Sequence, residues 1–198
     1  AESGQCFRWK KMCPGRYFVI SDGRAACFFQ EKTGIRILCR EKDEEYFRRY
    51  LDLDIDYGKV IEQIDEKDDF LIGAAQMGRG IRILRQNLWE MIISFIISQR
   101  NNIPRIMKSI DALCEKLGEQ IVFDYEGEHL VGYTFPSPEV IVGADLSEFK
   151  FGYREKYIWQ TAEDVLNRKF LFDLPWDMEQ TTEPVIFTDQ IDWQYMPG

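Results

Sequence analysis

The sequence predicts an α+β protein, in which a small antiparallel β-sheet is followed by an incomplete α-helical domain. Three observations support this fold class. Short β-rich runs separated by turn residues fill the start of the chain, helical spacing begins at Glu41, and no periodicity persists beyond Asn167. We therefore predict a partial N-terminal sheet domain at residues 1–52, an incomplete helical domain at 53–166, and an acidic, irregular tail at 167–198.

Turn signals divide the start of the chain into short strands. Pro14-Gly15, Asp22-Gly23 and Thr33-Gly34 are pairs that favour tight turns, and Asp-Gly between two β-rich runs is a strong hairpin signal. Because the chain starts without Met and directly on a β-rich run, we expect the natural N-terminus and a first strand to be missing. The strands are expected at Gln5–Lys10, Arg16–Ile20, Ala25–Gln30 and Gly34–Cys39.

Helical spacing follows in the middle of the chain. Glu44–Leu51 and Tyr57–Glu66 have charged outer faces. Asn87 is a candidate N-cap for a helix over Leu88–Ser98, which is apolar around most of its circumference and is therefore expected to be buried. Its apolar run comprises Leu88, Met91, Ile92, Phe95 and Ile96.

A second long helix is predicted over Ile103–Leu117. Pro104 lies in its first turn and Gly118 follows its last residue, an asymmetry typical of real helices. Phe135–Pro138 is expected to cap a short helix, and Tyr153–Leu166 to form the last one. The apolar stripe of the long helix comprises Ile103, Ile106, Ile110, Leu113 and Leu117.

The net charge of −9 seems to oppose nucleic-acid binding, because neutralisation of phosphates supplies much of that affinity. The distribution of charge changes this expectation. Between Gln76 and Lys108, six Arg and Lys residues stand against the single Glu90, whereas the segment from Leu171 onward carries six acidic residues and no basic one. The middle of the chain can therefore present a basic surface despite the acidic total.

Cysteine and histidine content argues against metal sites. The chain has five cysteines, no Cys-x-x-Cys pair and one histidine, so we expect reduced, mostly buried thiols and no metal or cofactor. No apolar run approaches 18 residues and no signal peptide opens the chain, so no membrane span is expected.

Two segments have residues suited to DNA, and each also has a purely structural explanation. Ser98–Ile106 places amides and guanidinium groups between two helices, where they can read base edges or bind phosphate. The alternative is a polar turn supported by Asn101 and Asn102. At Gly152–Tyr157, an exposed Tyr153 followed by Arg154 suits a wedge into a base stack. The alternative is a packed tyrosine beside a solvated arginine.

A third segment, Ser3–Trp9, contains a glycine whose backbone can approach a ligand closely. The carbonyl of Gly4 would then be able to accept a hydrogen bond from a ring N–H. The alternative is a turn glycine that enters a strand.

Together these segments resemble the 8-oxoguanine DNA glycosylases of the helix-hairpin-helix superfamily. The resemblance covers about residues 1–165, in the right order and at suitable spacing, and the long central motif is the most specific. The motifs are SGQCFRW (Ser3–Trp9), YLDLDIDY (Tyr50–Tyr57), GIRILRQNLWEMIISFIISQRNNIPRI (Gly80–Ile106), FPSPE (Phe135–Glu139) and FGYREKYI (Phe151–Ile158).

The resemblance implies an incomplete helix-hairpin-helix glycosylase fold and a base-flipping repair enzyme. It implies that the Gly4 carbonyl senses the N7 hydrogen that distinguishes 8-oxoguanine from guanine. Asn101 and Asn102 match the turn that enters the space left by the extruded lesion, and Tyr153 matches the wedge. The residues that match contacts to the orphaned cytosine are Arg105 and Arg154.

Two departures from the family pattern affect this expectation. Arg100 stands where the family often has a third asparagine that contacts cytosine, which leaves the preference for the opposite base open. The family's hairpin, with the lysine that attacks the sugar and a later aspartate, has no counterpart here, and no lysine follows Lys169. No catalytic residue is therefore assigned. The tail, Phe170–Gly198, weakly resembles the N-terminal region of heparinase-type polysaccharide lyases.

By family, the expected function is base-excision repair by an 8-oxoguanine DNA N-glycosylase with AP lyase activity, impaired in this chain. The alternatives are a non-catalytic damaged-DNA-binding remnant and a chimera with a polysaccharide-lyase-like tail. The expected partner is double-stranded DNA with 8-oxoguanine opposite cytosine, in the bacterial cytoplasm at the nucleoid. We also expect uncovered apolar faces on Leu88–Ser98 and Ile103–Leu117, and self-association through them.

Overall fold

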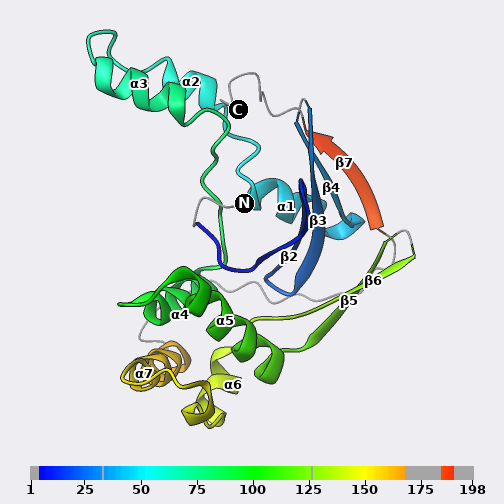
Figure 1. Ribbon diagram of the computed structural model, residues 1–198, viewed down its shortest axis with the longest axis vertical. Helices are drawn as coiled ribbons and strands as arrows, with labels where there is room; N and C mark the ends of the chain where they lie inside the picture. The colour runs from blue at the N-terminus through cyan, green and yellow to red at the C-terminus, as the bar shows by residue number, and fades with distance from the viewer. Residues whose placement is uncertain (1–4, 33, 126, 168–183, 190–198) are drawn as a thin grey trace. The chain divides into compact units, whose positions relative to one another are not determined.

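The computed structural model of the protein describes residues 5–32, 34–125, 127–167 and 184–189 (Figure 1). Within them, the chain divides into two compact units. The first unit comprises residues 5–10, 18–25 and 86–167, and the second comprises 11–17, 26–85 and 184–189. The predicted domain boundaries after residues 52 and 166 stay a prediction.

The larger sheet has the strand order β1-β2-β3-β4-β7. In the second unit, β3 pairs antiparallel with β4 so that Phe28 lies opposite Ile37, and β4 pairs antiparallel with β7. Asp22 and Gly23 both have positive φ, at 51° and 72°, which confirms the predicted tight turn before β3. The strands are β1 (Trp9–Cys13), β2 (Arg16–Ser21), β3 (Arg24–Glu31), β4 (Gly34–Arg40) and β7 (Pro184–Asp189).

The ends of this sheet differ from the sequence prediction. The first strand begins at Trp9 rather than Gln5, because the preceding residues make contacts with side chains instead of a strand ladder. Residues 184–189 form a strand within the tail that was expected to be irregular. The remainder of that tail, residues 168–183 and 190–198, lies outside the described residues, and so does its resemblance to polysaccharide lyases.

In the second unit, α1 supplies the core and the next two helices do not. Phe47 and Tyr50 of α1 are buried, and the Phe47 ring meets that of Phe28 edge-on at 5.8 Å between centroids. No residue of α2 or α3 is buried. The helices are α1 (Glu44–Tyr50), α2 (Tyr57–Ile61, shorter than predicted) and α3 (Asp69–Met77, not predicted), with a 3-10 turn at Glu41–Asp43 before them.

The YLDLDIDY motif forms a polar network within this unit. Asp52, at φ 54°, accepts hydrogen bonds from the Tyr57 hydroxyl at 2.8 Å and from the Arg85 guanidinium. Arg82 donates to the Asp52 carbonyl at 2.6 Å. Burial alone raises the pKa of Asp52, but the hydrogen bonds from Arg85 and Tyr57 outweigh it, so the pKa lies below its ordinary value. The motif therefore fastens the extended segment before Gln86.

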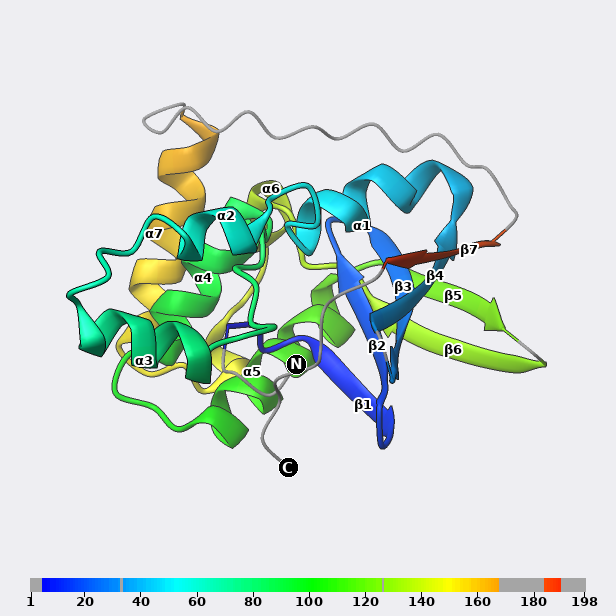
Figure 2. The same cartoon turned by 90° about the horizontal axis from the view of Figure 1, so that it is seen from above.

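The first unit is mainly helical, and its helices α4, α5, α6 and α7 lie beside one another in both views (Figures 1 and 2). Its core contains Trp89, Ile93, Ile110, Ile141 and Ile158, all at most 1% exposed. A hairpin of β5 and β6, which the sequence did not predict, extends from the helices. The elements are α4 (Leu88–Ser98), α5 (Ile103–Leu117), β5 (Gln120–Tyr125), β6 (Glu128–Tyr133), α6 (Pro138–Gly143), η2 (Ser147–Phe149) and α7 (Arg154–Leu166).

The two central helices have the predicted ends. The side chain of Asn87 caps α4 by accepting a hydrogen bond from the backbone N–H of Glu90 at 3.0 Å. Helix α5 begins at Ile103 with Pro104 in its first turn, and its C-cap is Gly118. A Cβ at Gly118 would overlap the Thr134 carbonyl oxygen, so only glycine lets the end of α5 approach this backbone.

Helix α4 is buried on one side only, so the expectation that it is buried around its circumference is wrong. Trp89, Ile93 and Ile97 form the buried face, and their spacing of four residues keeps them on one side of the helix. Leu88, Met91 and Phe95 occupy the other face and are 47%, 42% and 67% exposed. The expected uncovered face of α4 is therefore present.

The uncovered apolar face that was expected on α5 is absent. Ile106, Ile110 and Leu113 are buried, because α5 packs its apolar stripe against α4 and β6. Only Ile103, at the start of the stripe, is markedly exposed, at 55%.

Candidate nucleic-acid interface

The turn between α4 and α5, together with the first turn of α5, carries four of the predicted site residues. Arg100 has a positive φ of 49°, which reverses the chain after α4. Asn101 donates from its side chain to the Ile97 carbonyl at 3.2 Å and accepts from the backbone N–H of Asn102 at 3.0 Å. Asn102 is the N-cap of α5 and accepts from the backbone N–H of Arg105 at 3.0 Å. Both asparagines thus shape the turn, as the structural alternative required.

These hydrogen bonds leave other polar groups of the turn exposed. The side chains of Arg100, Asn102 and Arg105 are exposed, and Asn101 is half-buried. The backbone conformation is fixed by the asparagines, while the two guanidinium groups project from a turn whose shape is already set. A rigid turn with exposed donors is suited to reading a groove or an unpaired base.

Arg154, the second residue of the FGYREKYI tyrosine–arginine pair, binds this turn. Its Nε donates to the Gln99 carbonyl at 2.9 Å, and Nη2 donates to the carbonyls of Gln99 and, at 3.2 Å, Arg100. Nη1 reaches the Phe151 carbonyl at 3.2 Å. A cation is favourable here because the last carbonyls of α4 carry partial negative charge. One guanidinium therefore connects the start of α7 with the end of α4.

Tyr153 lies next to this connection. Its ring is 56% exposed, and the Arg154 guanidinium carbon lies 4.7 Å from the ring centroid. The Tyr157 ring supports it edge-on at 6.3 Å. Gly152, with φ 63°, provides the left-handed residue that lets the chain turn into α7. An exposed aromatic ring held from two sides has the form that a wedge requires.

The structure thus brings six of the seven predicted site residues to one place. The Arg154 bonds join Tyr153 to the turn that carries Arg100, Asn101 and Asn102, and Arg105 follows in the first turn of α5. Gly4 lies outside the described residues. The residues that follow it are described, and they are anchored to the start of α4.

Two contacts hold the segment after Gly4. The side-chain amide of Gln86 donates to the carbonyl of Gln5 at 2.7 Å. Arg8 and Glu90 form an ion pair with 3.0 Å between Nη1 and Oε2, and their side chains are only 7% and 8% exposed. Arg8 also donates to the Tyr133 carbonyl, and its guanidinium lies 5.9 Å from the Phe135 centroid.

The protonation equilibrium of the buried Glu90 carboxylate is shifted by its surroundings. Burial raises its pKa, because removal from water disfavours the charged form, and the ion pair with Arg8 opposes this without cancelling it. The same surroundings raise the pKa of the nearby Cys114 thiol to about 12, again through burial. Cys114 is therefore a packing residue rather than a nucleophile.

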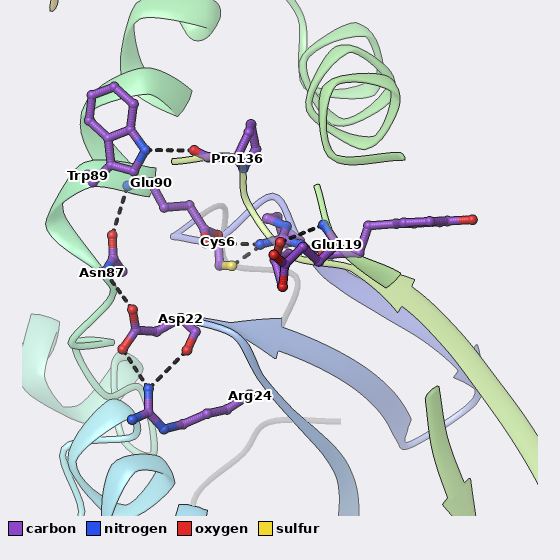
Figure 3. A network of polar contacts seen from close by, with 11 residues as sticks. Cys6, Asp22, Arg24, Asn87, Trp89, Glu90, Glu119 and Pro136 are labelled. Carbon is purple, nitrogen blue, oxygen red and sulfur yellow. Dashed lines mark hydrogen bonds and ion pairs between the residues drawn. The ribbon is translucent and has the colours of Figure 1, made fainter. Parts of the chain in front are cut away.

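Figure 3 shows how α4 is fixed at its first turn. Besides capping the helix, Asn87 donates from its side-chain nitrogen to an oxygen of Asp22 at 2.9 Å. Asp22 accepts in turn from Arg24 at 2.6 Å. Trp89 donates from its indole nitrogen to the Pro136 carbonyl at 2.9 Å, within the FPSPE motif. These bonds explain why the motifs contain polar residues at positions that carry no chemistry.

Sequence reasoning missed Arg8, Gln86 and Glu90. Glu90 gave a signal, since it is the one charged residue inside the apolar run of α4, where an unpaired charge would be costly. The signal predicts a buried cationic partner but not which one, because Arg8 is 82 residues away along the chain.

Within the described ranges, no three His, Cys, Asp or Glu side chains are grouped so as to hold a metal ion. None of the helices described is long and apolar enough to cross a membrane.

Comparisons with known proteins relate the chain to DNA glycosylases. Residues 1–92 match the family described as the 8-oxoguanine DNA glycosylase N-terminal domain. An N-glycosylase/DNA lyase of Saccharomyces cerevisiae is 34% identical over 194 residues, which cover 85% of this chain and 49% of the relative. The chain spans about half the length of the curated relatives it matches.

Two solved structures are similar in fold as well. MBOgg1, solved in complex with a low-affinity DNA ligand, has a TM-score of 0.75 and 38% identity, with 86% of this chain and 59% of that one covered. The 8-oxoguanine glycosylase/lyase of Clostridium acetobutylicum, bound to double-stranded DNA with cytosine opposite 8-oxoG, has a TM-score of 0.74 and 31% identity, with 85% and 58% covered. Residues 1–92 therefore match the N-terminal domain of 8-oxoguanine DNA glycosylases, and the fold of the chain is similar to those of MBOgg1 and the Clostridium acetobutylicum enzyme.

Proposed function

We propose that this chain is the DNA-reading part of an 8-oxoguanine N-glycosylase and AP lyase of base-excision repair, and that it binds double-stranded DNA with 8-oxoguanine opposite cytosine. The observation that carries the proposal is the set of hydrogen bonds from Arg154 to the Gln99 and Arg100 carbonyls. They unite an exposed aromatic ring with an amide-rich turn, the two parts needed to open a base stack and occupy the gap.

In this proposal each site residue has one task. Tyr153 enters the stack beside the lesion, and Asn101 and Asn102 occupy the space that the extruded nucleotide leaves. Arg105 donates to the orphaned cytosine. Arg154 faces the same base and fixes the turn, and Arg100 replaces an asparagine with a longer, charged donor.

Lesion recognition falls to the carbonyl of Gly4. The N7 of 8-oxoguanine carries a hydrogen, whereas guanine N7 is only an acceptor, so a fixed carbonyl attracts one base and repels the other. Discrimination of this kind requires that the carbonyl cannot turn away. Gln5 and Arg8, one and four residues later, are bonded to Gln86 and Glu90.

We further propose that these 198 residues bind the lesion without excising it. Base release and strand cleavage by this family require a lysine that forms a Schiff base with the sugar. The sequence has no lysine after Lys169 and no counterpart of the family's lysine hairpin. The alternative of a damaged-DNA-binding remnant describes the same behaviour for the isolated chain.

The test is borohydride trapping on a duplex with one 8-oxoguanine opposite cytosine, beside a gel-shift at two salt concentrations. We expect a salt-sensitive shift that is stronger than for a guanine–cytosine duplex, and no covalent adduct. An adduct would show that an amine of this chain attacks the sugar and would overturn the proposal of a non-catalytic reader. Equal shifts for both duplexes would overturn lesion recognition.

A matched pair of variants tests the site itself. Tyr153→Ala removes the wedge and should reduce the preference for the lesion duplex. Tyr125→Ala, on the β5–β6 hairpin, removes a tyrosine away from the turn and should leave that preference unchanged. Acidic-polysaccharide binding instead of DNA binding would favour a function carried by the tail.

We also propose that the chain acts at the bacterial nucleoid and self-associates through the uncovered face of α4. Leu88, Met91 and Phe95 form an apolar row along this helix that is exposed in the described part of the chain. Light scattering over a concentration series should show a mass that rises with concentration, and Phe95→Ser should suppress this rise. Val122→Ser, which replaces an exposed apolar side chain of β5 by serine, serves as the control.

A further inference from the structure

A shallow hollow lies on the first unit between the outer face of α5 and the turn η2. Its volume is about 660 Å³, and its lining includes Arg105, Lys108, Ala112, Phe149 and Lys150. Ala112 and Ser109 are small, so they leave open space between the longer side chains. The Phe149 ring forms one wall and is held by stacking on Phe151, with 5.5 Å between centroids.

Positive charge dominates this hollow. Its lining holds four cationic and two anionic side chains, and one pair is internally neutralised, because Lys116 Nζ lies 3.3 Å from a Glu148 carboxylate oxygen. Arg105, Lys108 and Lys150 are exposed, and no ion pair within the described ranges involves any of them. Three cations are therefore available to a ligand, against one remaining carboxylate, that of Glu115.

The hollow continues directly from the proposed DNA interface. Arg105 belongs to both, since Asn102 caps α5 three residues before it. Arg105 and Lys108 are three residues apart and so lie on the same face, about 4.5 Å apart along the axis of α5. Both side chains are long and flexible and project from the same face of the helix, so they can contact phosphates of one DNA strand together.

We propose that this hollow is a second DNA contact, which binds the phosphodiester backbone of the duplex outward from the turn. Lys108 and Lys150 neutralise phosphates there, and Arg105 links this contact to the site that reads the unpaired base. The inference rests on the proposed function, because it requires that the Asn101–Asn102 turn faces DNA. It adds a sequence-independent contact that would retain the protein on DNA without lesions.

The test compares the salt dependence of binding to an undamaged duplex, measured by fluorescence anisotropy with the full chain. Each neutralised phosphate contributes about −0.9 to the slope of log K against log salt. Lys108→Gln/Lys150→Gln should therefore reduce the slope by up to about 1.8 and weaken binding at low salt. Lys59→Gln/Lys67→Gln makes the same change of charge on exposed lysines of the second unit and should leave the slope unchanged.

The outcomes separate this inference from the function on which it rests. If both double variants bind the undamaged duplex with the same slope of log K against log salt as the wild type, the second contact is overturned and lesion recognition stays intact. A flatter slope in Lys108→Gln/Lys150→Gln with an unchanged preference for the lesion duplex would support it. Absence of any DNA binding by the unaltered chain would overturn both proposals. Circular dichroism of each variant verifies that the fold is retained.

Discussion

Replacement of Arg8 by Met should destabilise the first unit strongly, because it leaves the Glu90 carboxylate buried without its partner. The two side chains are 7% and 8% exposed, so little water can compensate. The change removes the charge-assisted bond to Glu90, the bond to the Tyr133 carbonyl and the contact with Phe135. Breaking a buried pair from one side typically costs about 3–5 kcal/mol.

Glu90→Gln should cost less, about 1–2 kcal/mol. The raised pKa of Glu90 shows that the site disfavours a carboxylate charge on balance, and glutamine keeps an oxygen that accepts from Arg8. The double variant Arg8→Met/Glu90→Gln should recover part of the loss of Arg8→Met, because no buried charge then remains unpaired. The double-mutant cycle isolates this coupling.

The assay is urea unfolding monitored by circular dichroism and tryptophan fluorescence, with Lys116→Met as the control. Lys116 and Glu148 are also paired, at 3.3 Å, but are 61% and 49% exposed, so their loss should cost at most about 1 kcal/mol. If Arg8→Met unfolds within about 1 kcal/mol of the wild type, the pair does not carry the stability ascribed to it.

Three further predictions concern other parts of the chain. Gly118→Ala should destabilise the fold by about 1–3 kcal/mol in urea unfolding, because the added methyl overlaps the Thr134 carbonyl. Gly73→Ala, with open space around it, should not destabilise the fold, and equal effects of the two variants would contradict the close approach at Gly118. The pKa of Asp52 is lowered in the fold, so its stabilising contribution is fully present above its unfolded pKa of about 3.9 and is lost as pH falls through the folded pKa. The urea midpoint of Asp52→Asn should therefore fall less steeply with acid than that of the wild type, and parallel curves would refute this. Asn102→Ala should cost about 1 kcal/mol of stability, because α5 loses its N-cap. Asn102→Asp should retain the cap but weaken DNA binding in a gel-shift, and unaltered binding by this variant would remove Asn102 from the interface.

Local signals in the sequence were sufficient for most elements. Asn87, Pro104 and Gly118 define the ends of α4 and α5 as predicted, because caps depend on residues a few positions apart. The Asp22-Gly23 turn follows from two residues alone. The residues predicted to contact DNA came from motifs, and the structure brings those that it describes together.

Long-range contacts could not be predicted in the same way. The alternating pattern of β5 and β6 is weak, with Asp124 and His129 facing each other across the hairpin, so the hairpin was missed. The apolar circumference of α4 suggested full burial, because periodicity alone does not show which neighbours cover a helix. The role of Arg154 as a connection between α4 and α7 depends on carbonyls 54 and 55 residues away, which no local pattern contains.

The guanidinium of Arg154 has a thermodynamic consequence for association. Because it binds the carbonyls of Gln99 and Arg100 within the free chain, the backbone of the turn has little conformational entropy left to lose when a ligand arrives. The backbone of this turn is thus ordered during folding. Under the proposed function, encounters with DNA would then be limited by diffusion and unstacking of bases rather than by rearrangement of this turn.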